Sequence, residues 1–168
     1  MGMDDAHGVM QIHSCPSALA QHVEWTLSHV LGTVIRLDWR EQPALDRGVR
    51  AELDWIGAAG SAARLASAMR GWKDTRFEVT ESTGPNRDGV RFVHTPSLGI
   101  FYTLTDAIGN AMIGEDRIRY AMELAAGDAR ELERELSIAL GTVWDEELEP
   151  YRAARFIPSL VGDASRAV

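Results

Sequence analysis

The chain has little that would cross-link it internally or hold it in a membrane. Its 168 residues include a single cysteine, Cys15, which excludes an internal disulfide. No apolar run approaches the roughly 18–20 residues that cross a bilayer. The first residues, with Asp4 and Asp5 among them, lack the basic and apolar segments of a signal peptide. We therefore expect a cytoplasmic protein with no membrane partner.

Basic residues are few, and almost all of them are arginine. Lysine occurs once, at Lys73, among 17 basic residues, and 25 acidic residues give a net charge of −8. Residues 115–149 hold 11 acids and four arginines and so carry −7 of that charge. Nucleic-acid binding needs clustered Lys or Arg that face phosphates, and no such stripe is present. We expect no nucleic-acid partner, whereas the acidic segment favours approach to a basic protein partner.

The patterns of the first half predict a two-layer α+β core. Period-2 alternation predicts strands over 8–14, 33–40, 48–56 and 75–80. Apolar residues at helical spacing predict one helix from Pro16 to Gly32 and another over 57–72, with Ser61 as its N-cap. The resulting order, β-α-β-β-α-β over residues 8–82, is that of a ferredoxin-like core with both helices on one face of an antiparallel sheet.

The second half is predicted to extend this core with strands and then with helices. Residues 89–113 form the strand extension, and residues 115–150 form an acidic helical part. The helical part is expected to hold one helix at about 115–124 and a longer helix that opens at Asp128 and has an apolar stripe reaching Val143. Residues 152–168 are expected to be a loose tail. No linker separates two units, so we expect residues 1–168 to be a single α+β domain.

Polar and charged side chains occupy the outward positions of the predicted strands. Arg36, Glu52, Arg76 and Glu78 are examples, and the strand aromatics fall on the inward side. An RNA-binding sheet would instead display aromatic rings outward. Opposite charges on neighbouring strands stabilise a sheet by ~0.2–1 kcal/mol per pair. This face is therefore predicted to be solvated or covered by later elements; a polar ligand or protein surface is the alternative.

Cys15 is the strongest chemical candidate, because it precedes Pro16, where the first helix is expected to begin. A helix N-terminus lowers the pKa of a thiol. His13 and His22 are candidate bases, and Trp25 lies beside His22, so these residues form a candidate ligand-binding group. A nucleophilic cysteine enzyme also needs an oxyanion site, and none is recognisable, so we assign no catalytic residue. The alternative for Cys15 is a small packed core residue.

Neither a metal nor a cofactor is expected from the other motifs. His22 and His29 are seven residues apart, about 10.5 Å along a helix, which is poor spacing for one shared metal. The sequence GAAGSA at 57–62 opens a helix, but it lacks the lysine of a Walker loop and the third glycine of a dinucleotide fingerprint.

The acidic run near the end of the helical part is the candidate partner-binding patch. It consists of Asp145, Glu146, Glu147 and Glu149. A carboxylate metal site needs ligands that converge from several directions, whereas one stretch of helix directs them apart. We therefore expect a solvated face or a docking patch for a protein.

Six segments, taken together, are similar to one protein family. They are HVEWTLSHVLG (22–32), the L-x-W-x-x-Q of Leu37 to Gln42, LASAMRGW (65–72), RFEVTE (76–81), TPSLGIF (95–101) and WDEELEPYR (144–152). The set resembles an actinobacterial family described as domain of unknown function 3145, over roughly residues 8 to 152. The resemblance implies no activity, cofactor or catalytic residue. The arginine-rich, lysine-poor composition fits a GC-rich source.

Two functions are compatible with these patterns. The first is a non-enzymatic, cytosolic protein-binding or regulatory module, favoured because no complete catalytic constellation is present and the negative charge is concentrated in residues 115–149. The alternative is a small-molecule-binding protein or an enzyme with a pocket near the first helix, around Cys15.

Overall fold

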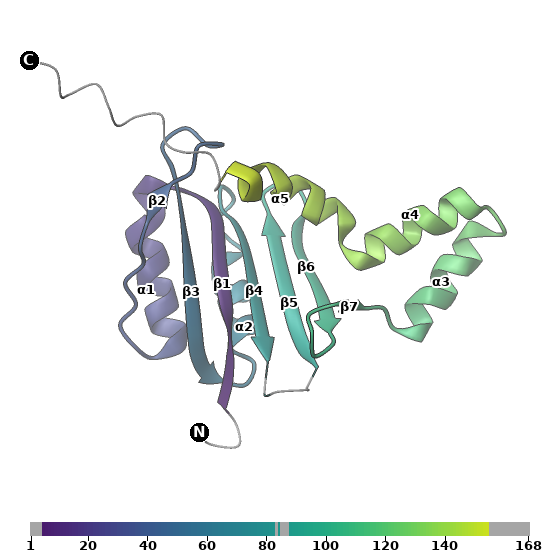
Figure 1. Cartoon of the computed structure of the whole chain (residues 1–168), viewed down its shortest axis with the longest axis horizontal. Helices are drawn as coiled ribbons and strands as arrows, with labels where there is room; N and C mark the ends of the chain where they lie inside the picture. The colour runs from purple at the N-terminus through teal and green to yellow at the C-terminus, as the bar shows by residue number, and fades with distance from the viewer. Residues whose placement is uncertain (1–4, 83, 85–87, 155–168) are drawn as a thin grey trace, which may run out of the picture.

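Seven strands form one antiparallel sheet in the computed structural model, which describes residues 5–82, 84 and 88–154. Their order across the sheet is β2-β3-β1-β4-β5-β6-β7 (Figure 1). The strands are β1 (Asp5–Pro16), β2 (Arg40–Glu41), β3 (Gly48–Ala58), β4 (Arg76–Ser82), β5 (Gly89–Thr95), β6 (Gly99–Thr105) and β7 (Ala111–Met112). The predicted α+β class is confirmed, and the strands after residue 89 extend the same sheet.

Two helices cover one face of this sheet. They are α1 (Ala20–Leu31), which follows a short 3-10 turn at Ser17–Leu19, and α2 (Ser61–Met69); both lie behind the sheet in Figure 1. The core between the layers includes Met10, Ile12, Cys15, Val23, Leu27, Trp55, Leu65, Met69, Phe77 and Val79. Burial of each large apolar side chain stabilises the fold by ~1.5–3 kcal/mol, which explains why the alternating strands and striped helices close against each other.

The predicted strand over 33–40 is wrong for residues 33–39, which follow α1 without pairing in the sheet. The backbone N–H groups of Ile35 and Leu37 are satisfied by side chains of α1 instead of by a strand partner. Ile35 N–H donates to Ser28 Oγ at 2.8 Å, and Leu37 N–H donates to the buried Glu24 carboxylate at 2.9 Å. The alternation correctly predicted an extended segment with one buried side, but it could not reveal where the backbone hydrogen bonds go.

The acidic helical part contains three helices, where two were predicted. They are α3 (Glu115–Ala125), α4 (Ala129–Leu140) and α5 (Thr142–Ala154). The predicted helix from Asp128 to Val143 is divided at Gly141, which adopts a left-handed conformation with φ +80°. A Cβ atom at Gly141 would lie 2.5 Å from Cε1 of Phe101 on β6, so the helices turn where glycine permits close approach to the sheet.

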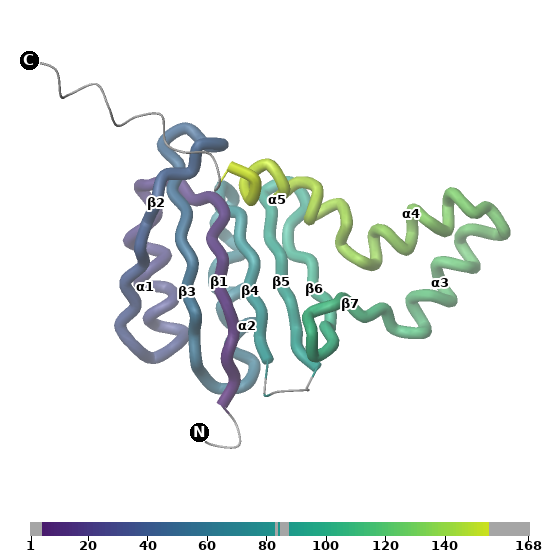
Figure 2. The backbone as a smooth tube through the Cα atoms, in the orientation of Figure 1, coloured from purple at the N-terminus to yellow at the C-terminus, as the bar shows by residue number. Residues whose placement is uncertain are grey.

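Helix α5 lies across the second face of the sheet, and the two helices before it extend away from the sheet beyond β6 and β7 (Figures 1 and 2). Because α5 continues to Ala154, the predicted tail over 152–168 is wrong for residues 152–154; residues 155–168 lie outside the described part of the chain. In the described ranges, every helix is too short or too polar to span a lipid bilayer.

Candidate functional site

Charged side chains on the outward face of the sheet converge beneath α5. Glu78 of β4 lies at the centre, and its Oε2 accepts hydrogen bonds from Arg91 of β5 at 2.6 and 2.9 Å. Its Oε1 accepts from Nε of Arg152 on α5 at 3.0 Å. Asp145 Oδ1 accepts from both arginines, at 2.6 Å from Arg91 and 2.8 Å from Arg152. Together with His13, these four residues form the Glu78 network, which ties α5 to two strands.

His13 joins the Glu78 network from β1. Its Nε2 lies 2.7 Å from Glu78 Oε1. The register of β1 against β3 shifts between Ile12 and Cys15, so β1 carries a bulge at His13, and a bulge re-aims the side chains around it. An ionised carboxylate only accepts hydrogen bonds, so Nε2 of His13 carries a proton. Nδ1 has no hydrogen-bond partner among the described residues.

The arginines keep the buried carboxylates of this network ionised. Burial acts to raise the pKa of Glu78. Its partners outweigh burial and hold that pKa far below the ordinary range of a glutamate. They act through hydrogen bonds from His13 and Arg152 and through the charges of Arg91 and His13. Burial likewise acts to raise the pKa of Asp145, and the hydrogen bonds from Arg91 and Arg152 outweigh it. The network therefore presents fixed charges, which suits a structural clasp between α5 and the sheet.

A second set of contacts holds α5 farther along the same face. Glu147 accepts hydrogen bonds from Thr95 Oγ1 at 2.8 Å and from the hydroxyl of Ser97. Its Oε1 lies 3.8 Å from Nη2 of Arg76, whose guanidinium sits 4.2 Å from the ring centroid of Tyr151. The buried amide of Gln42, the last residue of the L-x-W-x-x-Q segment, donates to the Tyr151 carbonyl at 3.2 Å. The end of α5 is therefore fixed against both the sheet and the loop after β2.

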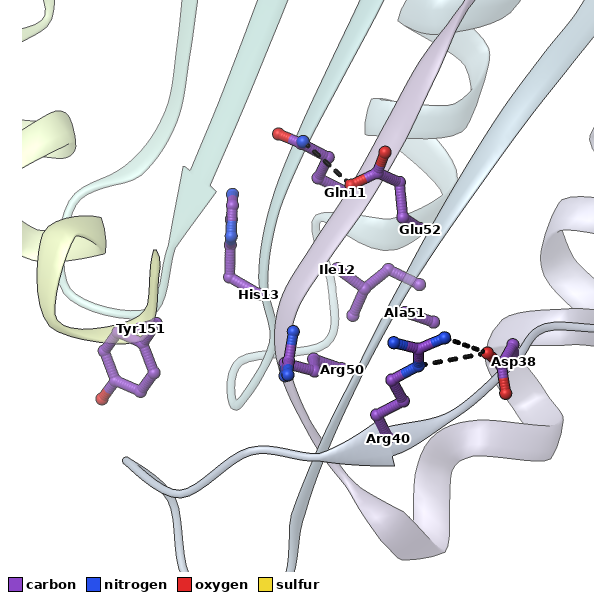
Figure 3. A pocket seen from close by; sticks show the side chains of 9 residues that line it. All are labelled: Gln11, Ile12, His13, Asp38, Arg40, Arg50, Ala51, Glu52 and Tyr151. Atoms are coloured by element: carbon purple, nitrogen blue, oxygen red, sulfur yellow. Dashed lines mark hydrogen bonds and ion pairs between the residues drawn. The ribbon is translucent and has the colours of Figure 1, made fainter. Parts of the chain in front are cut away.

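A polar pocket of about 290 Å³ opens beside the Glu78 network (Figure 3). Strands β1 and β3, the segment before β2 and the last turns of α5 form its walls. The residues that matter for its chemistry are His13, Asp38, Arg40, Arg50, Glu52 and Tyr151. The lining thus combines two cations and two carboxylates with one imidazole and one phenol, which suits a small polar molecule.

The structure separates Cys15 from the pocket. Cys15 is the penultimate residue of β1 and belongs to the core beneath α1 and α2, whereas His13 points to the opposite face, where Glu78 lies. Burial raises the pKa of the Cys15 thiol to about 12. The expectation that a helix N-terminus lowers this pKa is wrong, because the β-bulge and the 3-10 turn place Cys15 in the core ahead of α1.

His22 and Trp25 are brought together, but away from Cys15 and His13. Their ring centroids lie 5.1 Å apart on the exposed side of α1. With His29 of α1 and Trp72, which follows α2, they line a shallow groove between the two helices. The predicted ligand-binding group of Cys15, His13, His22 and Trp25 is therefore distributed over three separate places in the fold.

The acidic run of α5 divides into two pairs. Asp145 and Glu147 face the sheet in the contacts described above, whereas Glu146 and Glu149 are exposed. The loop at 57–62 also has an internal partner, because Glu81 accepts hydrogen bonds from the backbone N–H groups of Gly60 at 2.7 Å and Ala62 at 2.8 Å. This carboxylate occupies the N-terminus of α2; Gly60, and not the predicted Ser61, is the N-cap residue.

Helices α3 and α4 form a hairpin that packs on itself and on α5 rather than on the sheet, as Figure 2 shows. Among the apolar side chains of α3 and α4, only the alanines Ala121 and Ala125 are buried. Leu132, Leu136 and Ile138 of α4 are half-buried, whereas five larger apolar side chains are exposed: Ile118, Tyr120, Met122, Leu124 and Leu140. We call these five the hairpin surface.

Sequence reasoning missed the partners that create these sites. The alternation of β4 and β5 placed Glu78 outward, but Arg91 and Arg152 were not singled out. Opposite charges on neighbouring outward positions were the available signal for Glu78 and Arg91. The hairpin surface had no such signal, because Ile118 and Met122 lie at the spacing of an ordinary buried stripe.

Comparison with known proteins gives one match. The family model described as protein of unknown function (DUF3145) matches residues 9–157, and the chain belongs to this family. No curated protein and no solved structure matches the chain.

Proposed function

We propose that this member of the DUF3145 family is a non-enzymatic protein-binding module of the cytoplasm, and that the α3–α4 hairpin is the element that docks its partner. The single observation that carries the proposal is the packing of the hairpin, in which Ala121 and Ala125 are the fully buried apolar side chains and five larger ones are exposed. The buried, free Cys15 supports a reducing compartment. The resemblance and the arginine-rich composition support an actinobacterial source.

The order β2-β3-β1-β4, with α1 and α2 on one face, supports a ferredoxin-like origin for residues 8–82. In that arrangement the second strand is reduced to two residues, and β5, β6 and β7 continue the sheet beyond the fourth. We infer a single α+β domain in which this core is a scaffold, since its helices and strands bury one another, and the hairpin is the added element.

The hairpin surface is apolar enough to contribute to binding. Met122 is 58% exposed and Leu124 is 47% exposed. Covering such side chains contributes about 25 cal/mol per Å² of apolar area. A two-helix hairpin in which two alanines are the fully buried apolar side chains has little stability of its own, so a partner that covers this surface also stabilises the hairpin.

Charge selects the kind of partner. Residues 115–140 hold seven acids and four arginines, a net charge of −3, within a chain of net charge −8. Two copies of so acidic a surface repel each other, whereas a groove rimmed by Lys or Arg attracts it. The occupant we propose is therefore a different protein with an apolar groove and a basic rim. Asp145 and Glu147 already bind the sheet, so the attraction comes from hairpin acids such as Glu123 and Glu133.

Site-specific photo-cross-linking in the native cell tests this proposal. A benzoylphenylalanine at position 122 reports on the hairpin, and the same group at position 34, where Val34 is exposed far from the hairpin, is the matched control. We expect one protein to cross-link from position 122 and not from position 34. The cross-linked peptide should come from an apolar groove that carries Lys or Arg at its rim.

Two variants separate the hairpin from the acidic run of α5. The double variant E123Q/E133Q should weaken binding of the purified cross-linked partner, and the loss should shrink at high salt. The matched double variant E146Q/E149Q removes the same charge from exposed positions of α5 and should leave binding unchanged. Cross-links only to a second copy of this chain, or equal cross-linking from position 34, would overturn the proposal.

A further inference from the structure

The pocket beside the Glu78 network is separate from the hairpin and has its own chemistry. It lies over β1 and β3, whereas the hairpin begins beyond β7 at the other edge of the sheet (Figure 1). Its walls come from four segments that are distant in sequence, and its volume of about 290 Å³ matches a molecule of metabolite size. The β-bulge that aims His13 lies in its wall, and bulges are frequent beside binding sites.

His13 supplies the first recognition element. Its Nε2 lies 2.7 Å from the Glu78 carboxylate, so the orientation of the ring is fixed. Nδ1 is the nitrogen left for a ligand, and His13 lines the pocket. A carboxylate that fixes one side of an imidazole in this way pre-organises the other side for a hydrogen bond to a bound molecule.

The charges of the wall supply the second element. Arg40 and Arg50 contribute guanidinium groups, and Asp38 and Glu52 contribute carboxylates (Figure 3). Arg40 donates to Asp38 at 2.8 and 3.1 Å, and Glu52 accepts a hydrogen bond from Gln11 at 3.1 Å. Arg50 Nε donates to the Glu41 carbonyl at 3.1 Å. Charges of both signs therefore line the same small volume. A zwitterion matches both signs, whereas a ligand with a single charge would also face groups of its own sign.

We propose that this pocket binds a small zwitterion of the amino-acid type. Its carboxylate would lie on the guanidinium side, at Arg40 and Arg50, and its ammonium group would lie on the carboxylate side, at Glu52. Nδ1 of His13 hydrogen-bonds to the ligand, and the ring of Tyr151 forms an apolar wall for its side chain. This inference does not depend on the hairpin, because the two sites share no residue.

Nuclear magnetic resonance of the full chain, labelled with ¹⁵N, tests the proposal. The probes are the proteinogenic amino acids, each compared with two analogues that keep a single charged group, the corresponding amine and the corresponding carboxylic acid. We expect at least one amino acid to shift the His13 imidazole resonances and the backbone amides of β1 and β3 around the pocket. Neither single-charge analogue should reproduce the effect.

Two carboxylate variants on β3 give the matched comparison. E52Q removes a charge from the pocket, and D54N removes a charge from the same side of β3 outside the pocket. Both positions are exposed, so both variants should fold, which their spectra will show. We expect E52Q to raise the Kd of the amino acid about tenfold or more and D54N to leave it unchanged, because only E52Q removes the charge that faces the ammonium group.

Three outcomes would overturn the proposal. The first is that no amino acid shifts the pocket resonances. The second is that the carboxylic acid alone binds as well as the amino acid, which would make the pocket an anion site. The third is that E52Q and D54N weaken binding equally, which would indicate general surface electrostatics.

Discussion

Replacing Glu78 by glutamine should destabilise the folded protein far more than removal of an exposed carboxylate does. Glutamine keeps the volume and removes the charge that Arg91, Arg152 and His13 share. Removing one partner of a buried ion pair costs about 3–5 kcal/mol, because the remaining charges stay buried without compensation. Asp145 still contacts both arginines, so we expect the lower part of that range.

Urea denaturation, followed by circular dichroism, gives the free energy of unfolding of each protein by linear extrapolation. The control is E131Q, which removes an exposed glutamate paired with Arg134 and should have little effect. Trp144 of α5 reports on the same contact, because its indole N–H donates to the Gly99 carbonyl of the sheet at 3.1 Å. Since the Glu78 network holds α5, E78Q should expose Trp144 and shift the tryptophan fluorescence. Equal stability of E78Q and E131Q would refute the assignment of Glu78 as the centre of the clasp.

The pH dependence gives a second readout of the same claim. The pKa of Glu78 is lower in the folded protein than in the unfolded chain, so its contribution is complete above the unfolded pKa of about 4.3 and is lost as the pH falls toward the folded pKa. The difference in stability between the wild type and E78Q should therefore be constant near neutral pH and shrink in acid. A difference that grows below pH of about 4 would contradict the lowered pKa.

Two further predictions concern buried positions. A thiol-specific reagent should modify Cys15 only when the chain unfolds, because burial raises the pKa of its thiol to about 12; rapid modification of the native protein would contradict this burial. Gly141 and Gly127 both have positive φ, so an alanine is strained at either position. Only at Gly141 does the new methyl group meet Phe101, since Gly127 has open space around it. G141A should therefore destabilise the protein by about 1–3 kcal/mol more than G127A. Equal thermal unfolding of the two alanine variants would show that Phe101 does not restrict the turn.

Much of the scaffold could be predicted from local patterns, because its strands and helices alternate apolar and polar residues with the correct period. The failures occur where tertiary partners replace local ones. Residues 33–39 have the alternation of a strand, but Glu24 and Ser28 satisfy their backbone donors. The helix predicted through Gly141 has a continuous apolar stripe, but contact with the Phe101 ring sets the turn.

The candidate sites were harder to predict, because each depends on residues that are far apart in the sequence. His13 was selected for its proximity to Cys15, and the bulge of β1 places the two on opposite faces. Asp145 was selected as an exposed acid, but Arg91 and Arg152 bind it. No local signal distinguishes an acid that meets its own sheet from one that meets a partner.

Hydrogen–deuterium exchange of the purified protein, alone and with the partner cross-linked from position 122, tests the central claim most directly. The account predicts that amides of α3 and α4 exchange much faster than those of β1 and β4 in the isolated protein, because two alanines are the fully buried apolar side chains of the hairpin. Addition of the partner should slow exchange over residues 115–140 and leave the sheet unchanged. Protection of the hairpin equal to that of the sheet without a partner, or slowing confined to residues outside 115–140, would contradict docking through the hairpin.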